Sequence, residues 1–166
     1  VWLIKPDLDN RDDYTDENGN RVTVVKSRIG LSAVAEVIKR DQNVLERFCE
    51  ITKDGTIDAI ICDECQFLTE AQVDQLKYIA EYYETPVLCF GLRADFQTKL
   101  FEGSRRLFEI ADSITEVKSV CRCGKKAIVN ARVSEDGKIV TEGAQIEIGG
   151  NDKYESMCWR CWQNRI

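Results

Sequence analysis

Residues Ile57 to Phe67 read Ile-Asp-Ala-Ile-Ile-Cys-Asp-Glu-Cys-Gln-Phe, and this stretch indicates the fold more strongly than any other. A short apolar run bounded by polar residues is typical of a buried parallel strand. In open α/β sheets, chemistry gathers at the carboxyl ends of such strands, where Asp63 and Glu64 stand. Because successive strand side chains point in opposite directions, one carboxylate can face a metal ion while the other faces a substrate hydroxyl. The alternative is a pair of solvated acids that opens a turn.

Length and composition limit the class of protein. The 166 residues are 43% hydrophobic, which is enough for one compact domain, or for a domain with a small appendage. Their 23 Lys and Arg against 29 Asp and Glu give a net charge of −6, so broad attraction to nucleic acid or to anionic membranes is not expected. No apolar run approaches the roughly 18 residues of a membrane-spanning helix, and no secretion signal is recognisable at the start. We therefore expect a cytoplasmic protein that acts on a small, locally recognised substrate.

The segments around the acidic pair predict an α/β domain. Val1 to Ile4 reads as a buried strand, and capping-box patterns begin helices at Asn43 and Thr69. A further strand over Val87 to Phe90 then delivers Gly91 and the loop after it to the sheet edge that carries the acidic pair. Strand, helix and strand in this order imply a right-handed parallel crossover, so we predict a parallel sheet with flanking helices.

The remaining segments give weaker patterns. Val22 to Val25 fits a short strand, and Ala33 to Ile38 is ambiguous between helix and strand. Leu107 to Ile110 fits a short helix, and Ile114 to Val120 fits a strand that leaves the core. Because few core-forming residues follow, we predict a domain over residues 1–118 and a small second domain over residues 119–166.

The cysteines fall into two groups. Four stand singly in strand-like or helix-like contexts, where cysteine is usually a small buried hydrophobe: Cys49, Cys62, Cys65 and Cys89. The other four form two close pairs: Cys121 with Cys123, and Cys158 with Cys161. Without a secretion signal, paired cysteines favour a metal over disulfides, and a closed set of four thiolates suits structural zinc. Inert cysteines and a disulfide or redox pair are the alternatives.

Five motifs, in this order along nearly the whole chain, resemble the type II thymidine kinases, the cytosolic zinc-bearing class. They are Asp63-Glu64-Cys65-Gln66-Phe67, Gly91-Leu92 followed by Asp95-Phe96-Gln97 and Phe101, Cys121-x-Cys123-Gly124, residues 148–154 (Ile-Gly-Gly-Asn-Asp-Lys-Tyr), and Cys158-x-x-Cys161. The resemblance implies a P-loop-type parallel sheet with a zinc ribbon and a lasso loop. It also implies transfer of the γ-phosphate of ATP to the 5′-hydroxyl of thymidine, or of deoxyuridine, to give dTMP in nucleotide salvage. Magnesium, structural zinc and a homotetramer are expected with it, and nucleic-acid and membrane partners are not.

Matched position by position, the resemblance assigns roles to individual residues. Glu64 matches the general base and Asp63 the acid that holds magnesium, and Asp9 and Arg11 match an Asp-x-Arg near the transferring phosphate. The stretch expected to bind ATP and magnesium is Asp63, Glu64, Cys65 and Gln66. The residues expected around the thymine ring are Phe67, Leu92, Phe96, Phe101, Asn130, Ile146, Ile148 and Tyr154. Without the resemblance, the phenylalanines would be assigned to an ordinary core.

One family motif is not found. The phosphate loop Gly-x-x-x-x-Gly-Lys-Ser/Thr is absent from these 166 residues, and Val1 to Ile4 resembles the family's second strand. We therefore expect a first strand, phosphate loop and helix upstream of Val1, and we expect the chain as written to be inactive because the triphosphate lacks its cradle.

Two other functions compete with a nucleoside kinase. Asp63-Glu64-Cys65-Gln66 also resembles the acidic box of nucleic-acid helicases, so a helicase-type ATPase fragment is one alternative; ATPase activity stimulated by duplex would favour it. A non-catalytic zinc-ribbon interaction module is the other, and it predicts that Glu64→Gln leaves function untouched.

Overall fold

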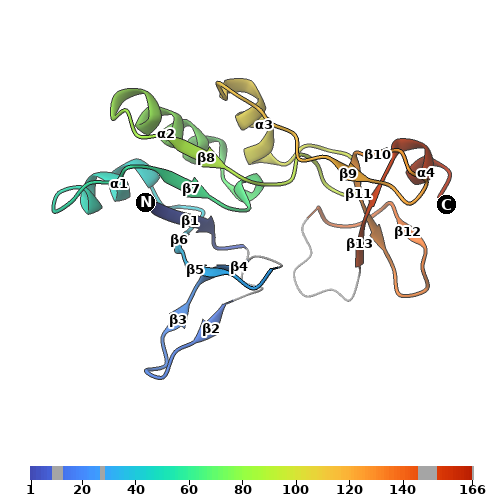
Figure 1. Cartoon of the computed structure of the whole chain (residues 1–166), viewed down its shortest axis with the longest axis horizontal. Coiled ribbons are helices and arrows are strands. Elements are labelled where there is room, and N and C mark those ends of the chain that lie inside the picture. Colours follow the sequence, from blue (N-terminus) through green and yellow to red (C-terminus); the bar gives the residue numbers. More distant parts are fainter. Residues whose placement is uncertain (9–12, 27–28, 146–152, 166) are drawn as a thin grey trace. The chain divides into compact units, whose positions relative to one another are not determined.

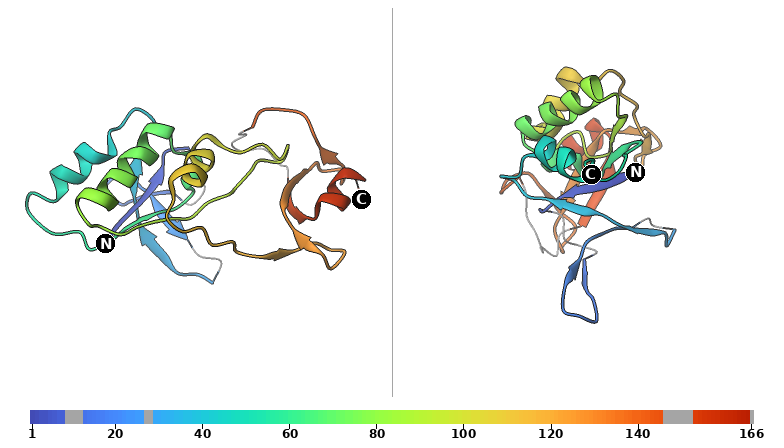
Figure 2. Two further views of the ribbon diagram at one scale, coloured as in Figure 1. Left: turned by 90° about the horizontal axis from the view of Figure 1, so that it is seen from above. Right: turned by 90° about the vertical axis from the view of Figure 1, so that its left-hand side faces the viewer.

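The computed structural model describes residues 1–8, 13–26, 29–145 and 153–165. The chain divides into two compact units, shown in Figures 1 and 2. The first unit consists of Val1–Leu92 and Glu102–Ala111, and the second of Arg93–Phe101 and Asp112–Ile166. The boundary predicted between residues 118 and 119 stays a prediction. In the described part of the chain, no helix is long and apolar enough to cross a membrane.

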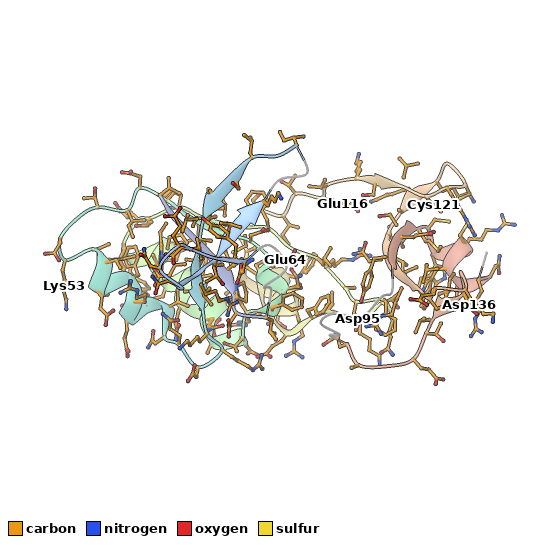
Figure 3. The ribbon with its side chains drawn as sticks, turned by 90° about the horizontal axis from the view of Figure 1, so that it is seen from below. Lys53, Glu64, Asp95, Glu116, Cys121 and Asp136 are labelled. Atoms are coloured by element: carbon orange, nitrogen blue, oxygen red, sulfur yellow. The ribbon has the colours of Figure 1, made fainter. Side chains whose placement is uncertain are left out.

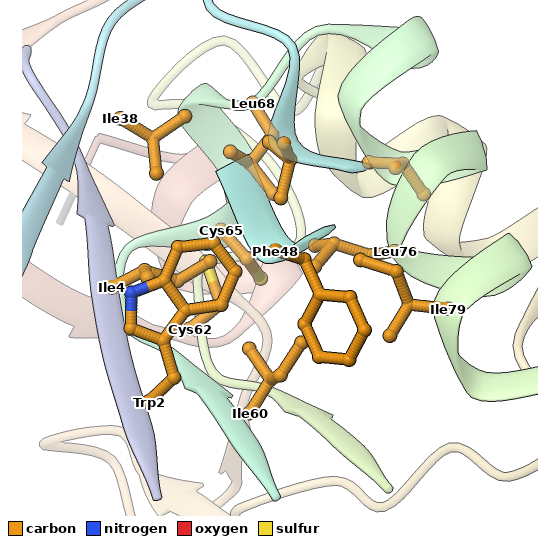
Figure 4. Packing of buried hydrophobic residues seen from close by; sticks show 12 residues of the cluster. Trp2, Ile4, Ile38, Phe48, Ile60, Cys62, Cys65, Leu68, Leu76 and Ile79 are labelled. Atoms are coloured by element: carbon orange, nitrogen blue, oxygen red, sulfur yellow. The ribbon is translucent and has the colours of Figure 1, made fainter. Parts of the chain in front are cut away.

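A four-stranded parallel sheet forms the centre of the first unit. Its strand order is β6-β1-β7-β8, and every neighbouring pair is parallel. The strands are β1 (Trp2–Pro6), β6 (Glu36–Ile38), β7 (Ile60–Cys62) and β8 (Val87–Cys89), and three of them run side by side in the close view of Figure 4. The predicted α/β class is confirmed. Strand β1 extends two residues beyond the prediction, and Pro6, which has no N–H to donate, is the register partner of Ile38 at its last position.

The predicted helix starts are confirmed in atomic detail. Helix α1 (Val44–Ile51) begins after Asn43, whose side chain accepts a hydrogen bond from the Glu46 backbone N–H at 3.1 Å. Helix α2 (Glu70–Tyr82) begins with a complete capping box between Thr69 and Gln72. Helix α3 (Glu102–Ile110) starts five residues before the predicted short helix.

The core of the first unit lies between one face of the sheet and the helices. Trp2, Ile4, Ile60 and Cys62 alternate along β1 and β7, and they pack with Phe48 of α1 and with α2 side chains (Figure 4). Leu3, Ile61 and Leu88 are register partners on the opposite face, where Leu88 is 45% exposed. The described residues therefore bury one face of the sheet more completely than the other.

Two short hairpins complete the first unit. They are β2 (Tyr14–Thr15) with β3 (Arg21–Val22), and β4 (Val24–Lys26) with β5 (Ser32–Val34). The ambiguous segment 33–38 therefore forms strand, in β5 and β6. Beside the hairpins, the Asp13 carboxylate lies 3.4 Å from the buried Lys5 ammonium and accepts hydrogen bonds from Arg21 and Thr23. Burial alone would raise the pKa of Asp13, but these hydrogen bonds and the Lys5 charge lower it below its usual value.

Short antiparallel strands and one helical turn build the second unit. Strand β9 (Ser119–Val120) pairs with β10 (Lys126–Ala127), and β11 (Val129–Val133) lies between β12 (Ile139–Val140) and β13 (Lys153–Met157). Helix α4 (Trp159–Gln163) closes the described chain. The strand predicted over residues 114–120 is wrong for residues 114–118, which are exposed and have no assigned strand. An apolar pattern there was not matched by a partner strand, and Val117 is 87% exposed.

Candidate functional site

Asp63 and Glu64 follow strand β7 at the carboxyl end of the sheet, as predicted. The Asp63 backbone N–H donates to the Ile4 carbonyl at 3.0 Å, which continues the β1–β7 ladder to the acidic pair. Its carboxylate then accepts a hydrogen bond from the Glu64 backbone N–H at 3.0 Å. Glu64, labelled in Figure 3, has φ 51°, in the left-handed region, and leads into the 3₁₀ turn η1 (Cys65–Phe67). A left-handed residue other than glycine costs about 1 kcal/mol or more, and such strain clusters at functional sites.

Gln66 holds the Glu64 carboxylate in place. Its side chain is only 1% exposed, and its Nε2 donates to Glu64 Oε2 at 2.5 Å. Its Oε1 accepts a hydrogen bond from the Leu92 backbone N–H at 3.0 Å. The buried amide therefore links the strand-tip acid to the loop after β8. Because both amide ends are used, Gln66 supports the Glu64 carboxylate.

Two glycines allow this close approach. A Cβ at Gly91 would lie 2.5 Å from Gln66 Oε1 and 2.7 Å from the Cys65 sulfur. A Cβ at Gly103 in α3 would lie 2.5 Å from the Cys65 carbonyl oxygen and 2.8 Å from that of Leu68. All four distances are shorter than a normal contact of a Cβ atom. The turn that carries Glu64 is thus enclosed by the loop after β8 on one side and by α3 on another.

Three thiols lie near the acidic pair, on its own strand and turn and on the neighbouring strand β8. Cys62 and Cys65 are buried, and Cys89 is the register partner of Cys62 on β8. Hydrogen bonding with Cys89, together with burial, raises the pKa of both the Cys62 and the Cys65 thiols. The Cys62 and Cys65 thiols therefore stay protonated and act as small core side chains, as the sequence predicted for single cysteines. Hydrogen bonds with these two thiols lower the pKa of the Cys89 thiol to about 4.

In the second unit, Arg132 lies against the rings of both Phe96 and Tyr154. Arg132 belongs to β11 and is the register partner of Tyr154 on β13. Its guanidinium carbon lies 4.2 Å from the centroid of the Phe96 ring and 5.9 Å from that of Tyr154. Its Nε donates to the Tyr154 hydroxyl at 3.2 Å. Phe96 is 1% exposed and Tyr154 is 55% exposed, so the cluster joins a buried ring to an accessible one.

The turn that carries Phe96 is fixed by Asp95, which is labelled in Figure 3. The buried Asp95 carboxylate accepts hydrogen bonds from the backbone N–H groups of Gln97 and Lys99, both at 2.9 Å. It also accepts one from Gln145 Nε2 at 2.9 Å. Gln97 donates in turn to the carbonyls of Thr141 and Gly143, at 3.2 and 3.4 Å. This turn therefore anchors Thr141, Gly143 and Gln145.

Four cysteines of the second unit form a cluster that could hold a metal ion. The sulfurs of Cys121, Cys123, Cys158 and Cys161 all lie within 4.8 Å of one another, and those of Cys123 and Cys158 are 3.6 Å apart. Backbone N–H groups of Cys123 and Cys158 lower the pKa of the Cys121 thiol to about 6, which favours the thiolate that binds metals. The structure thus brings together all four residues that the sequence proposed as ligands.

The other predicted site residues separate by unit. Those placed in the first unit are Asp63, Glu64, Cys65, Gln66, Phe67 and Leu92. Those placed in the second unit are Phe96, Phe101, Asn130 and Tyr154. Asp9, Arg11, Ile146 and Ile148 lie outside the described residues, and their roles stay predictions. Phe101 is buried, Asn130 is half-buried on β11, and Leu92 is 43% exposed.

Sequence reasoning did not identify Arg132 or Gly103, and it named Gly91 only as part of a family motif, without its close contacts. One signal could have found Arg132: strand alternation puts it on the same face of β11 as Asn130, which the resemblance places near the base. The glycines carry no such local signal, because the atoms that crowd them come from segments distant in sequence.

Comparison with known proteins identifies the family. The family described as Thymidine kinase matches residues 1–162. A thymidine kinase of Enterobacteria phage T4 is 45% identical over 164 residues, which are 98% of this chain and 79% of the phage protein. Thymidine kinases of Shewanella oneidensis and Vibrio vulnificus are 44% and 46% identical, each over 81% of this chain and 70% of its own length. The family match and these relatives show that the chain belongs to the thymidine kinases, which are ATP-dependent nucleoside kinases.

Proposed function

We propose that this thymidine kinase uses Glu64 as the general base that accepts the proton of the thymidine 5′-hydroxyl while the γ-phosphate of ATP is transferred. The observation that carries the proposal is the geometry of Glu64, which stands at a strand tip in a left-handed conformation with its carboxylate held by Gln66. A general base held in its reactive orientation loses no further conformational entropy when the substrate binds, and a positioned general base typically increases the reaction rate roughly 10²- to 10⁴-fold.

Asp63 is the acid proposed to hold magnesium. One of its carboxylate oxygens accepts the Glu64 backbone N–H, and an oxygen ligand of this kind suits magnesium, which usually keeps several waters. The ion would neutralise charge on the phosphates during transfer. Asp63 and Glu64 are adjacent at the strand tip, so the two tasks of metal binding and proton acceptance are divided between neighbours.

On the family resemblance, the residues around the thymine ring are proposed to be Phe67, Leu92, Phe96, Phe101, Asn130 and Tyr154. The described members supply flat or apolar side chains and one amide, which suits a flat, mostly apolar pyrimidine ring. The proposal extends to Ile146 and Ile148, and to Asp9 and Arg11 near the phosphate, on the resemblance alone.

We propose that the four-cysteine cluster holds structural zinc. Tetrahedral zinc with Zn–S bonds of about 2.3 Å places sulfurs about 3.8 Å apart, close to the 3.6 Å between Cys123 and Cys158. Four thiolates leave no open position for water, so the ion would stabilise the second unit and take no part in the chemistry. A homotetramer without nucleic-acid or membrane partners is proposed from the family resemblance.

The experiment supplies the kinase, expressed as its complete natural chain, with ATP, magnesium and one nucleoside. We expect dTMP from thymidine and no product from 5′-deoxythymidine, which keeps the base but lacks the accepting hydroxyl. Zinc content should approach one ion per chain. Preferential phosphorylation of deoxycytidine, or ATP hydrolysis that duplex DNA stimulates without any dTMP, would overturn the assignment.

A further inference from the structure

Arg132 has an environment that an arginine rarely occupies. Its side chain is 2% exposed, although its position on β11 alternates with the buried Val129, Ala131 and Val133. Taking a guanidinium out of water is unfavourable unless its surroundings compensate, so a buried arginine usually has a definite task.

Two aromatic rings provide much of this environment. The guanidinium lies over the Phe96 ring at 4.2 Å, and its Nε donates to the Tyr154 hydroxyl at 3.2 Å. The backbone of Gly143 packs against the same two side chains, since a Cβ there would lie 3.3 Å from Arg132 Nη1 and 4.0 Å from the Phe96 ring. Arg132 therefore contacts a ring from the Asp95 turn and a ring from β13 at once.

We propose that Arg132 is a positioning residue for thymidine binding: its guanidinium fixes the Phe96 and Tyr154 rings relative to each other before the nucleoside arrives. This inference rests on the proposed function, which assigns both rings to the base site. Binding to rings that are already ordered avoids the entropy loss of ordering them, so the effect falls on thymidine affinity.

The chemistry of arginine suits this task better than that of lysine. A planar guanidinium can stack on one ring while its in-plane N–H donates to another group, whereas an ammonium is a point charge on a flexible stem. The backbone around Phe96 is also fixed, because the carboxylate of Asp95, which precedes Phe96, accepts hydrogen bonds from the backbone N–H groups of Gln97 and Lys99, which follow it. Phe96 is thus fixed from its backbone and from its ring face, and Arg132 links it to Tyr154.

The test compares R132K and R132M with wild type in the complete natural kinase, with Y154F and the R132M/Y154F double variant beside them. Lys138, an exposed cation paired with Asp136 in the same unit, supplies the matched control K138M. Thymidine KM, ATP KM, kcat and zinc content are measured for each variant. R132K retains a buried cation, and the zinc content reports whether the second unit is folded. Misplaced Phe96 and Tyr154 rings are therefore distinguished from an unfolded second unit.

We expect R132M to raise thymidine KM about 10-fold, since it removes both a cation–π contact and a hydrogen bond. R132K should recover part of this loss, while ATP KM, kcat and zinc content change less than about 2-fold and K138M matches wild type. In the double variant, the removal of the Tyr154 hydroxyl should add little to R132M, because the bond it makes is already gone.

Two results would overturn the inference: an unchanged thymidine KM in the zinc-replete R132K and R132M proteins, or an equal change in both KM values and kcat, which would mark a merely structural residue. Failure of the wild-type enzyme to use thymidine would instead refute the proposed function, so the two failures are distinguishable.

Discussion

Replacing Gly91 by alanine should disturb the catalytic turn through one added methyl group. That carbon would lie 2.5 Å from Gln66 Oε1, 2.7 Å from the Cys65 sulfur and 3.2 Å from the Cys65 backbone nitrogen. Gln66 cannot simply swing aside, because it is buried and both ends of its amide are hydrogen-bonded. The backbone angle at Gly91 lies outside the left-handed range, so the expected effect is steric.

The magnitude follows from the contacts that must yield. Overpacking by one methyl costs about 1–3 kcal/mol, and losing the Gln66 bond to the Glu64 carboxylate costs about 1.5–3 kcal/mol. The two costs do not add in full, because a shift of Gln66 that breaks the hydrogen bond also relieves part of the overpacking. We therefore expect Gly91→Ala to lower the free energy of unfolding by about 2–4 kcal/mol. Gly103→Ala should be at least as severe, because the atoms it meets are backbone carbonyl oxygens of Cys65 and Leu68, which cannot rotate away.

Urea denaturation of the zinc-loaded protein, followed by far-ultraviolet circular dichroism, measures this effect. Gly55→Ala is the matched control, since a Cβ there meets nothing within 4 Å and the backbone angle is not left-handed. The reasoning predicts a control close to wild type and a lower midpoint for Gly91→Ala, with kcat reduced as well because the Glu64 carboxylate loses its support. A Gly91→Ala protein as stable and as active as the Gly55→Ala control would refute it.

Three further predictions concern other parts of the molecule. Gln66→Leu should lower kcat about 10-fold or more, because it removes the donor to Glu64, and should change the thymidine Kd less, because only the support of the Leu92 N–H is lost on that side; isothermal titration and steady-state kinetics separate the two. Cys161→Ser, or a zinc chelator, should unfold the second unit and leave the first folded, because metal binding supplies on the order of 10 kcal/mol to small metal-bound domains; hydrogen exchange that shows both units equally protected would contradict this. Asp13→Asn should weaken the loss of stability at acid pH. The lowered pKa of the Asp13 carboxyl stabilises the folded state above the unfolded pKa of about 3.9, and this contribution is lost as the pH falls through the folded pKa. Denaturation midpoints measured from neutral to acid pH test this, and a variant that loses stability as steeply as wild type would contradict it.

The sequence predicted the elements that depend on local rules. Helix α2 begins where Thr69 and Gln72 form a capping box, and the β7 strand ends where the apolar run meets Asp63. These signals lie within a few residues of one another, so no tertiary information is needed to recognise them. The cysteine cluster could be predicted for a related reason, because two close pairs can supply a tetrahedral site whatever fold joins them.

The remaining features depend on segments that meet only in the folded chain. Arg132 is buried because Phe96 and Tyr154 cover it, and nothing in the β11 sequence states which rings will do so. Gly91 and Gly103 matter because the Cys65 turn approaches their backbones. Glu64 also adopts a left-handed conformation, which its intrinsic backbone preference disfavours. The errors at residues 114–118 have the opposite cause, since an apolar pattern there found no strand to pair with.

The most direct test of the account is the effect of Glu64→Gln on turnover and on thymidine binding in the complete natural kinase. The amide oxygen of glutamine can still accept from Gln66 Nε2, so the turn should stay intact while the proton acceptor is lost. We predict that kcat falls about 10²- to 10⁴-fold while the thymidine Kd changes less than about 3-fold, and that the exposed control Glu70→Gln behaves as wild type. A Glu64→Gln enzyme that turns over at the wild-type rate would contradict the assignment of Glu64 as the base.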